Sequence, residues 1–364
     1  MYSVQVRKIA PLTITTFLLG SLLSAHAQAA IKPGSKCTTQ GQIKNFQGKK
    51  FTCIKSGKKL LWNKGIRLAD PRPEVAAQKD NFTPWASKFD TQTLIQAALG
   101  ATDKYFGEVT PSSSYQMNID PAITADDRAW ITRSLDYVNG AFSKIEREQM
   151  RVFLGTNHEW SASTLRAANL WVGDPSSSFP CSQGLLDAYC AERNLILLIY
   201  SDIYSGKTKT RWDVGRRATP AHEVFHTVQF ALAGENVGGL EPTHIPRWLM
   251  EGSANYFGFY IVEKLGFDIY QSGRNQEVTN NSAYRSTYPL SHYDDFQTNP
   301  YGIGQAATEY LVASAGFENF LNIWRFTKSE QDFAKGFKKA IGIDISDFYA
   351  KFDAARPSMK IGTS

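Results

Sequence analysis

His222 and His226 stand four positions apart, and Glu223 directly follows the first of them. On a helix, side chains at i and i+4 share one face, so both imidazoles can reach a common metal ion. Histidine pairs suit zinc, whose catalytic sites keep one coordination position open for water. Glu223 is placed to take a proton from that water as a general base. The spacing predicts a zinc-dependent hydrolytic site; the alternative is a helix whose histidines only cover the core.

A zinc site of this kind needs a third protein ligand. A third histidine at short spacing would require glycine at position 229 and histidine at position 232, where the chain has Gln229 and Leu232. Glu251 lies 25 positions after His226, in the segment Trp248–Ala254 (WLMEGSA). A loop containing glycine and proline separates the two segments and permits an antiparallel pair of helices. The Glu251 carboxylate can therefore face the two imidazoles.

The two motifs together resemble those of the gluzincin metallopeptidases, the peptidase MA-like group that includes thermolysin and aminopeptidase N. The resemblance implies that His222, His226 and Glu251 bind one Zn²⁺ per chain. It implies that Glu223 is the general base when a zinc-activated water hydrolyses a peptide bond. The Gly-Ala-Met-Glu-Asn-like segment with which the aminopeptidase-N group grips a substrate amino terminus has no match here, so aminopeptidase activity is not indicated. The choice between exo- and endopeptidase stays open.

Two further residues are candidates for the same site. By the resemblance, Tyr301 takes the position of a tyrosine that hydrogen-bonds the developing oxyanion; its alternative role is packing. Asn255 lies four residues after Glu251 and could orient a ligand histidine.

The predicted fold class is α+β, with a zincin-like catalytic lobe and a helical C-terminal lobe from about residue 300, within a domain over 81–364. The catalytic lobe would combine a small mixed sheet with the helix that carries His222 and His226, called the metal helix below. Apolar runs predict strands at 151–154 and 194–200. In gluzincins the edge strand pairs with the peptide substrate, and 169–172 is the candidate for that strand.

Local signals predict the limits of four segments. Thr219 and Pro220 indicate the N-cap and first turn of the metal helix, and Gly234 indicates its end. Helices are expected from Asp90 to about residue 106 and from Thr124 onward. Residues 271–299 are polar and are expected to form an irregular rim or lid.

The N-terminal part predicts export. Residues 1–29 have the charged, apolar and small-residue regions of a signal peptide, and no later run is long enough to span a membrane. A secreted, extracellular or cell-wall-associated bacterial protein is expected. Four cysteines then predict two disulfides, with the local pairs Cys37–Cys53 and Cys181–Cys190 favoured among three connectivities.

Residues 31–68 read as a small disulfide-stapled β module, followed by a linker over 69–80. The module resembles small Cys- and Lys-rich modules joined to secreted bacterial proteins. Of the 40 Lys and Arg residues, ten lie in 31–67, which hold no Asp or Glu, and two lie in 1–29; the remaining 28 stand against 34 acidic residues, a net charge of −6. The basic charge thus resides in the module.

The module's charge indicates a polyanionic partner, such as an anionic cell-wall polymer or lipid headgroups. Nucleic acid is not expected, because only three aromatic residues could stack on bases. The alternative is a solvated, solubilising face. For the whole protein, the alternative to a peptidase acting on peptide or protein substrates is a cell-wall-associated binding protein with a catalytically inactive, structural zincin-like domain.

Overall fold

The computed structural model describes residues 32–46, 49–67, 82–85, 89–170, 188–200, 212–234, 244–280, 288–294 and 299–359. The chain divides into two compact units, residues 1–76 and 77–364, and each is described by itself. The predicted signal peptide (1–29) and linker (69–80) lie outside the described residues.

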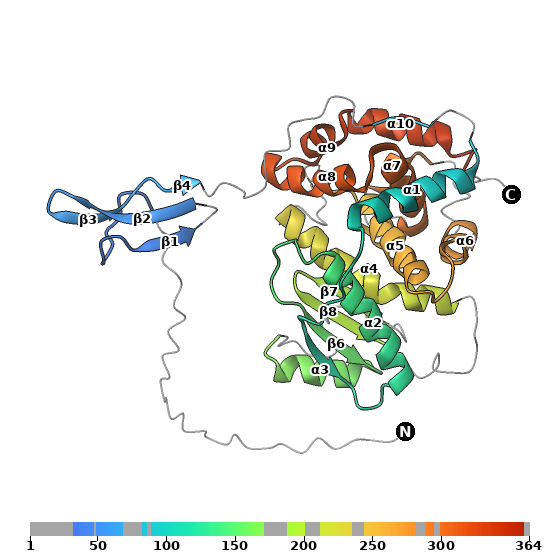
Figure 1. The fold of residues 1–364 in the computed structure, drawn as a ribbon, viewed down its shortest axis with the longest axis horizontal. Coiled ribbons are helices and arrows are strands. Elements are labelled where there is room, and N and C mark those ends of the chain that lie inside the picture. Colours follow the sequence, from blue (N-terminus) through green and yellow to red (C-terminus); the bar gives the residue numbers. More distant parts are fainter. Residues whose placement is uncertain are drawn as a thin grey trace, which may run out of the picture. The chain divides into compact units, whose positions relative to one another are not determined.

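The first unit is a small antiparallel sheet (Figure 1). Its strands are β1 (Ile43–Phe46), β2 (Lys49–Ser56), β3 (Lys59–Trp62) and β4 (Ile66–Arg67). β2 pairs with each of the other three strands. The predicted Cys37–Cys53 disulfide is present, and its core holds Phe51, Cys53 and Trp62. With so few buried side chains, the disulfide is a substantial part of what stabilises this unit.

The second unit contains a small mixed sheet in the order β5-β6-β8-β7. Its strands are β5 (Gln116–Ile119), β6 (Arg151–Gly155), β7 (Ala188–Glu192) and β8 (Leu195–Ile199). β5, β6 and β8 are parallel, whereas β7 is an antiparallel edge strand. The predicted strands at 151–154 and 194–200 are β6 and β8. The structure is thus mixed α/β, mostly helical with small sheets.

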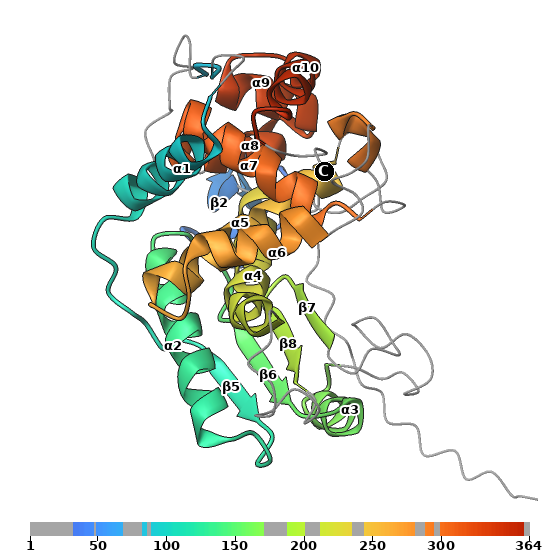
Figure 2. The same cartoon turned by 90° about the vertical axis from the view of Figure 1, so that its right-hand side faces the viewer.

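Helices cover both faces of this sheet (Figures 1 and 2). On one face of the sheet, Phe153 of β6 and Leu197 of β8 pack with Leu165 of α3 (His158–Ala167). On the opposite face, side chains such as Val152 and Leu198 belong to the main core, together with α2 (Ala125–Ala141) and α4 (Trp212–Ala233). Successive side chains of a strand point to opposite faces of the sheet. Since both faces are buried here, β6 and β8 are continuous apolar runs in the sequence.

The centre of the second unit is α5 (Arg247–Lys264), which packs on α4 and on α7 (Tyr301–Ala315). Its residues from Glu251 to Val262 are all buried. A helix that is buried on every side must be surrounded by other elements. Besides α4 and α7, α6 (Tyr270–Asn280) and the short 3-10 helix η3 (Leu290–Tyr293) pack on it. Individual side chains of α1 (Thr91–Phe106), α8 (Phe317–Glu330) and α10 (Ile345–Ala355) also contact it. α9 (Phe333–Ile341) packs on α8. Among the described helices, none has the length and apolar character needed to cross a membrane.

The predicted start of the metal helix was wrong. α4 begins at Trp212 and continues through Pro220. Proline has no N–H for the carbonyl four residues earlier, which belongs to Arg216. That carbonyl accepts a hydrogen bond from the Tyr200 hydroxyl instead, at 3.5 Å. A partner from the sheet thus lets proline lie within the helix. The predicted end holds, because Gly234 has a positive φ of 67° directly after α4.

The prediction of a strand at 169–172 was also wrong for residues 169–170, the part that the structure describes. Asn169 and Leu170 form the turn after α3, and Asn169 has a left-handed φ of 55°. Residues 171–172 lie outside the described residues. The described sheet has β5 and β7 as its edge strands, and the sequence did not predict β7.

Of two other expectations, one is correct in part and one is not tested. The expected irregular segment 271–299 contains α6 and η3, so it is partly helical. The Cys181–Cys190 pairing stays a prediction, because Cys181 and the side chain of Cys190 lie outside the described part of the chain.

Candidate metal centre

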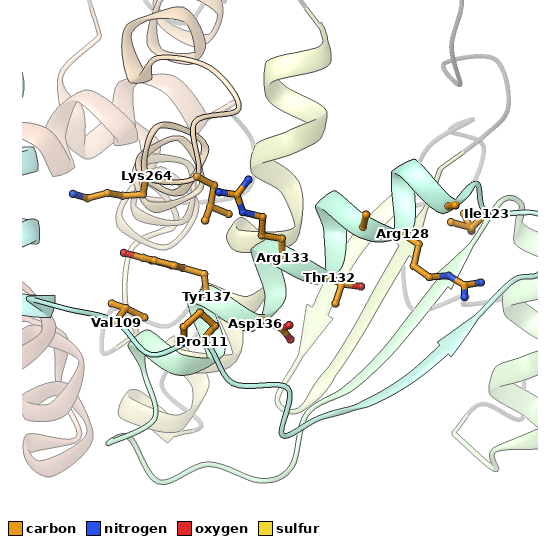
Figure 3. Close-up of a pocket in the computed structure, with 12 residues that line it drawn as sticks. Val109, Pro111, Ile123, Arg128, Thr132, Arg133, Asp136, Tyr137 and Lys264 are labelled. Carbon is orange, nitrogen blue, oxygen red and sulfur yellow. The ribbon is translucent and has the colours of Figure 1, made fainter.

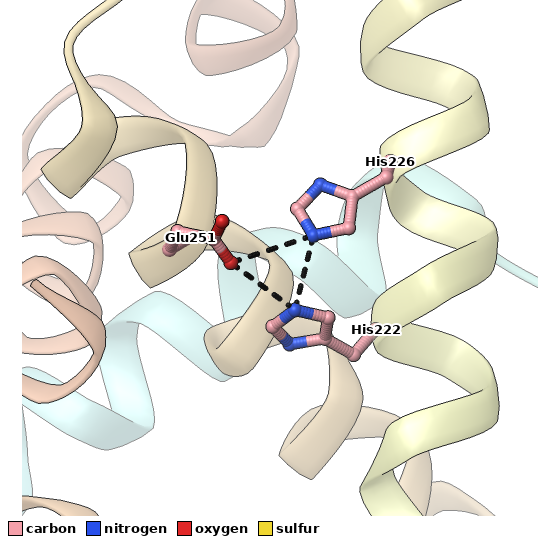
Figure 4. Close-up of side chains that lie close together, drawn as sticks. All are labelled: His222, His226 and Glu251. Carbon is pink, nitrogen blue, oxygen red and sulfur yellow. Dashed lines mark hydrogen bonds and ion pairs between the residues drawn. The ribbon is translucent and has the colours of Figure 1, made fainter. Parts of the chain in front are cut away.

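Three buried side chains meet between α4 and α5 (Figure 4). His222 and His226 come from successive turns of α4, and their Nε2 atoms are 3.0 Å apart. Glu251, in the second turn of α5, places its Oε2 atom 3.4 Å from Nε2 of His222 and 3.5 Å from Nε2 of His226. The three residues are 7–9% exposed. One ligand atom from each residue therefore faces a common point.

Hydrogen bonds hold the far side of both imidazole rings. Nδ1 of His222 lies 2.9 Å from Oδ1 of Asn255, and Nδ1 of His226 lies 2.8 Å from Oε1 of Gln229. The Gln229 amide is oriented in turn, because its Nε2 donates to the Met250 carbonyl at 2.9 Å. An amide oxygen only accepts, so each Nδ1 is the donor. When the rings are neutral, each carries its proton on Nδ1, and the unprotonated Nε2 atoms of the two rings face each other.

This arrangement fits a metal ion. With both rings neutral, two Nε2 lone pairs and a carboxylate oxygen face one another and repel, unless a proton or a metal ion lies among them. A cation bound among them removes that repulsion, and two histidines with one carboxylate form a ligand set used by zinc. The polar partners behind the rings are also typical of metal-binding histidines. The group formed by His222, His226 and Glu251 could thus hold a metal ion.

The electrostatics of the group favour a positive charge. Burial alone would lower the pKa of His226, but the Glu251 carboxylate outweighs it and raises the pKa to about 9. Burial likewise opposes the charge of Glu251, yet its contacts with both imidazoles hold its pKa well below its usual range. Nη2 of Arg247 lies 3.6 Å from the other carboxylate oxygen of Glu251.

Glu223 lies in the turn of α4 between the two histidines and is 6% exposed. Its carboxylate makes no hydrogen bond or ion pair to any described residue. Burial raises its pKa, the two neighbouring imidazoles oppose that rise, and Glu251 adds to it. A buried carboxylate without a partner is costly for stability, and carboxyl groups with raised pKa values concentrate at sites of proton transfer.

Tyr301 is brought to the same place from a distant part of the chain. It is the first residue of α7, and its ring centroid lies 6.1 Å from that of His222. Burial and the nearby charge of Glu251 raise the pKa of its phenol. The hydroxyl therefore stays protonated and available as a hydrogen-bond donor.

No protein-family model matches this chain, and no characterised protein or solved structure matches it. The interpretation of the centre therefore depends on its own geometry.

Three residues near the centre were missed by sequence reasoning. Gln229 lies three positions after His226, so helical spacing could have placed it beside that ring. Arg247 lies one turn before Glu251 and could have been found in the same way. Glu277 on α6 carried no such signal. Its burial raises the pKa of its carboxyl and the charge of His222 opposes that rise, and no described residue pairs with it.

A separate hollow of about 900 Å³ lies along α2 (Figure 3). Two of its polar groups have partners: Lys264 forms an ion pair with Asp103 at 2.6 Å, and Asp136 accepts from the Tyr115 hydroxyl at 2.7 Å. None of the metal-centre residues lines it.

Proposed function

We propose that the chain is a secreted zinc metallopeptidase with a gluzincin-like, zincin-type catalytic lobe. The observation that carries the proposal is the convergence of three buried ligand atoms, from His222, His226 and Glu251, beside the buried carboxylate of Glu223, which has no hydrogen-bond or ion-pair partner among the described residues. A metal-binding group alone would need no such carboxylate. Its presence supports a site that moves protons.

Each protein group has a definite task in peptide hydrolysis. Zinc, when held by the three ligands, supplies Lewis-acid chemistry and lowers the pKa of water toward ~7. Glu223 accepts the proton of the attacking water and delivers it to the leaving nitrogen. The Tyr301 hydroxyl donates a hydrogen bond to the oxygen that becomes negative in the transition state. Asn255 and Gln229 keep the imidazoles oriented throughout.

The edge of the sheet offers a place for the substrate backbone. β7 lies beside α4, and among the described strands it pairs only with β8. An extended peptide could add to the other edge of β7 through main-chain hydrogen bonds. A peptide or protein is therefore the proposed substrate, and β7 takes the role that the sequence reading assigned to 169–172.

The other candidate function is a cell-wall-associated binding protein in which the metal group is structural. Structural zinc sites are usually closed by four protein ligands. The described residues provide three, which favours the catalytic proposal.

The decisive experiment measures zinc content and peptide turnover of the mature protein and of Glu223→Gln. The glutamine is nearly isosteric but cannot accept the proton, so zinc should be retained while turnover falls by about 10²–10⁴-fold. Glu251→Ala should lose zinc as well as activity. Absence of peptidase activity in zinc-loaded wild type, or equal turnover by Glu223→Gln, would reject the proposal.

A further inference from the structure

Within the described residues 32–46 and 49–67, the positive charge of the N-terminal module has no acidic partner. All seven lysines that the structure describes in it are exposed, and none forms an ion pair or side-chain hydrogen bond with a described residue: Lys32, Lys36, Lys44, Lys55, Lys58, Lys59 and Lys64. Since residues 31–67 contain no Asp or Glu, no intramolecular partner is available within the module. An uncompensated charge of this density requires counterions or an anionic ligand.

The lysines lie on both faces of the sheet. Lys44 is opposite Phe51, and Lys55 follows Cys53 by two positions, so both belong to the face that carries the core. Lys59 is opposite Ser56 and Lys36 is opposite Leu61, on the other face. The positive charge therefore surrounds the module instead of forming one flat patch.

This distribution argues against a lipid bilayer as the partner. A bilayer contacts one side of a small module and is bound by exposed apolar side chains together with basic ones. Ile54 is the one large hydrophobic side chain described as exposed in this unit, at 44%. Lysines on the far side of the sheet would gain little from a planar surface, since their interactions are screened beyond about 8–10 Å.

The module also lacks described surfaces for base stacking. Of its three aromatic residues, Phe51 and Trp62 are buried, at 3% and 7% exposure, and the side chain of Phe46 lies outside the described residues. Proteins that bind single-stranded nucleic acid without sequence preference use exposed aromatic rings for that purpose. The interaction that remains is with the anionic backbone of a flexible chain, which can follow charges around the module.

We propose that the N-terminal module binds a linear, hydrophilic phosphate polymer by multivalent contacts between its lysines and successive phosphates. The affinity would come from the release of counterions from the polymer and would not depend on its sequence. This activity is independent of the metal centre and would hold the protein on an anionic polymer of the cell envelope.

The test uses the full mature protein and long-chain inorganic polyphosphate as the probe. The triple variant Lys55→Gln, Lys58→Gln, Lys59→Gln should bind on the order of 10–100-fold more weakly, and the slope of log affinity against log salt should fall by roughly 2. A matched variant with the same charge loss in the second unit, Lys104→Gln, Lys144→Gln, Lys351→Gln, should bind like wild type. Replacing Lys55, Lys58 and Lys59 with arginine should preserve binding, which separates charge loss from misfolding.

Two further probes test the choice of ligand. Vesicles of phosphatidylglycerol and single-stranded DNA should both bind more weakly than polyphosphate at equal phosphate concentration. Tighter binding to either one would overturn the proposal, as would equal affinity of the two glutamine variants for polyphosphate.

Discussion

Gly252 on α5 and Gly304 on α7 meet backbone to backbone. A Cβ atom on Gly252 would lie 2.0 Å from the carbonyl carbon of Gly304, and a Cβ atom on Gly304 would lie 2.1 Å from the Trp248 carbonyl oxygen. Gly252 directly follows Glu251, and Gly304 lies one turn after Tyr301. The close approach of the two helices therefore sets the position of Tyr301 relative to the metal group.

Gly252→Ala should force α5 and α7 apart. Overpacking typically costs about 1–3 kcal/mol, and a clash with backbone atoms belongs at the upper end of that range. Thermal unfolding at fixed zinc concentration measures the loss. Gly100→Ala is the control, because a Cβ atom there meets nothing within 4 Å in the interior of α1. It should stabilise the protein by about 0.5–1 kcal/mol. A Gly252→Ala protein as stable as wild type would contradict the described packing.

Tyr301→Phe should lower kcat with little effect on KM, if the hydroxyl acts only on the transition state. The ring and its contact with His222 remain in this variant, so zinc content should not change. Steady-state kinetics on one peptide, with metal analysis of the same sample, provide the measurement. An unchanged kcat would assign Tyr301 to packing.

Gln229→Met should weaken zinc binding by about 10–100-fold, the usual effect of losing a polar partner behind a metal ligand. The variant loses the hydrogen bond to His226 and the bonds that tie α4 to Met250 and Ser253. Competition with a chromophoric chelator gives the affinity. Gln305→Met is a suitable control, because Gln305 is equally buried but bonds to Tyr270 and Glu309. It should lose stability and keep its zinc affinity; equal weakening in both variants would refute the role of Gln229.

Glu277→Gln should stabilise the metal-free protein at neutral pH. Burial raises the folded-state pKa of Glu277 above its unfolded value, so the ionised group destabilises the fold. The destabilisation by the ionised carboxylate is fully present above the pKa of Glu277 in the folded protein. It decreases as the pH falls below that pKa and is gone below the value of the unfolded chain, near 4.5. The difference in Tm between variant and wild type should therefore be largest near neutral pH and shrink below about pH 4.5. A difference that does not change with pH would show that the carboxylate charge is not its cause.

The three residues of the candidate metal centre could be found from the sequence because their placement depends on helical spacing and on one short connection. Helical spacing alone places His222 and His226 on one face, and the second helix need only return antiparallel for Glu251 to meet them. Continuous apolar runs likewise located β6 and β8, because both faces of these strands are buried. These features depend on periodicity, which the sequence carries directly.

Features that depend on distant partners could not be predicted. Pro220 lies inside α4 because Tyr200, from the end of β8, bonds the carbonyl that proline leaves open. The contact between Gly252 and Gly304 joins residues on separate helices. Glu277 reaches the centre only because α6 packs beside α4 and α5. In each case tertiary packing determines where the residue lies, and the local sequence preferences do not indicate it.

The packing of α1 bears on when the protein can fold. α1 lies against α7 and α8, and the Thr91 hydroxyl donates to the Ser358 carbonyl at 2.7 Å, across 267 positions of the chain. The helical cluster is therefore closed by segments from opposite ends of the second unit. Contacts of such high sequence separation form late, because the loop between them must be closed first. A chain emerging from its amino end would expose the apolar face of α1 until α7 and α8, residues 301–330, were available. The helical cluster can therefore close only late in synthesis, and a chain not yet closed in this way suits the export that the sequence predicts.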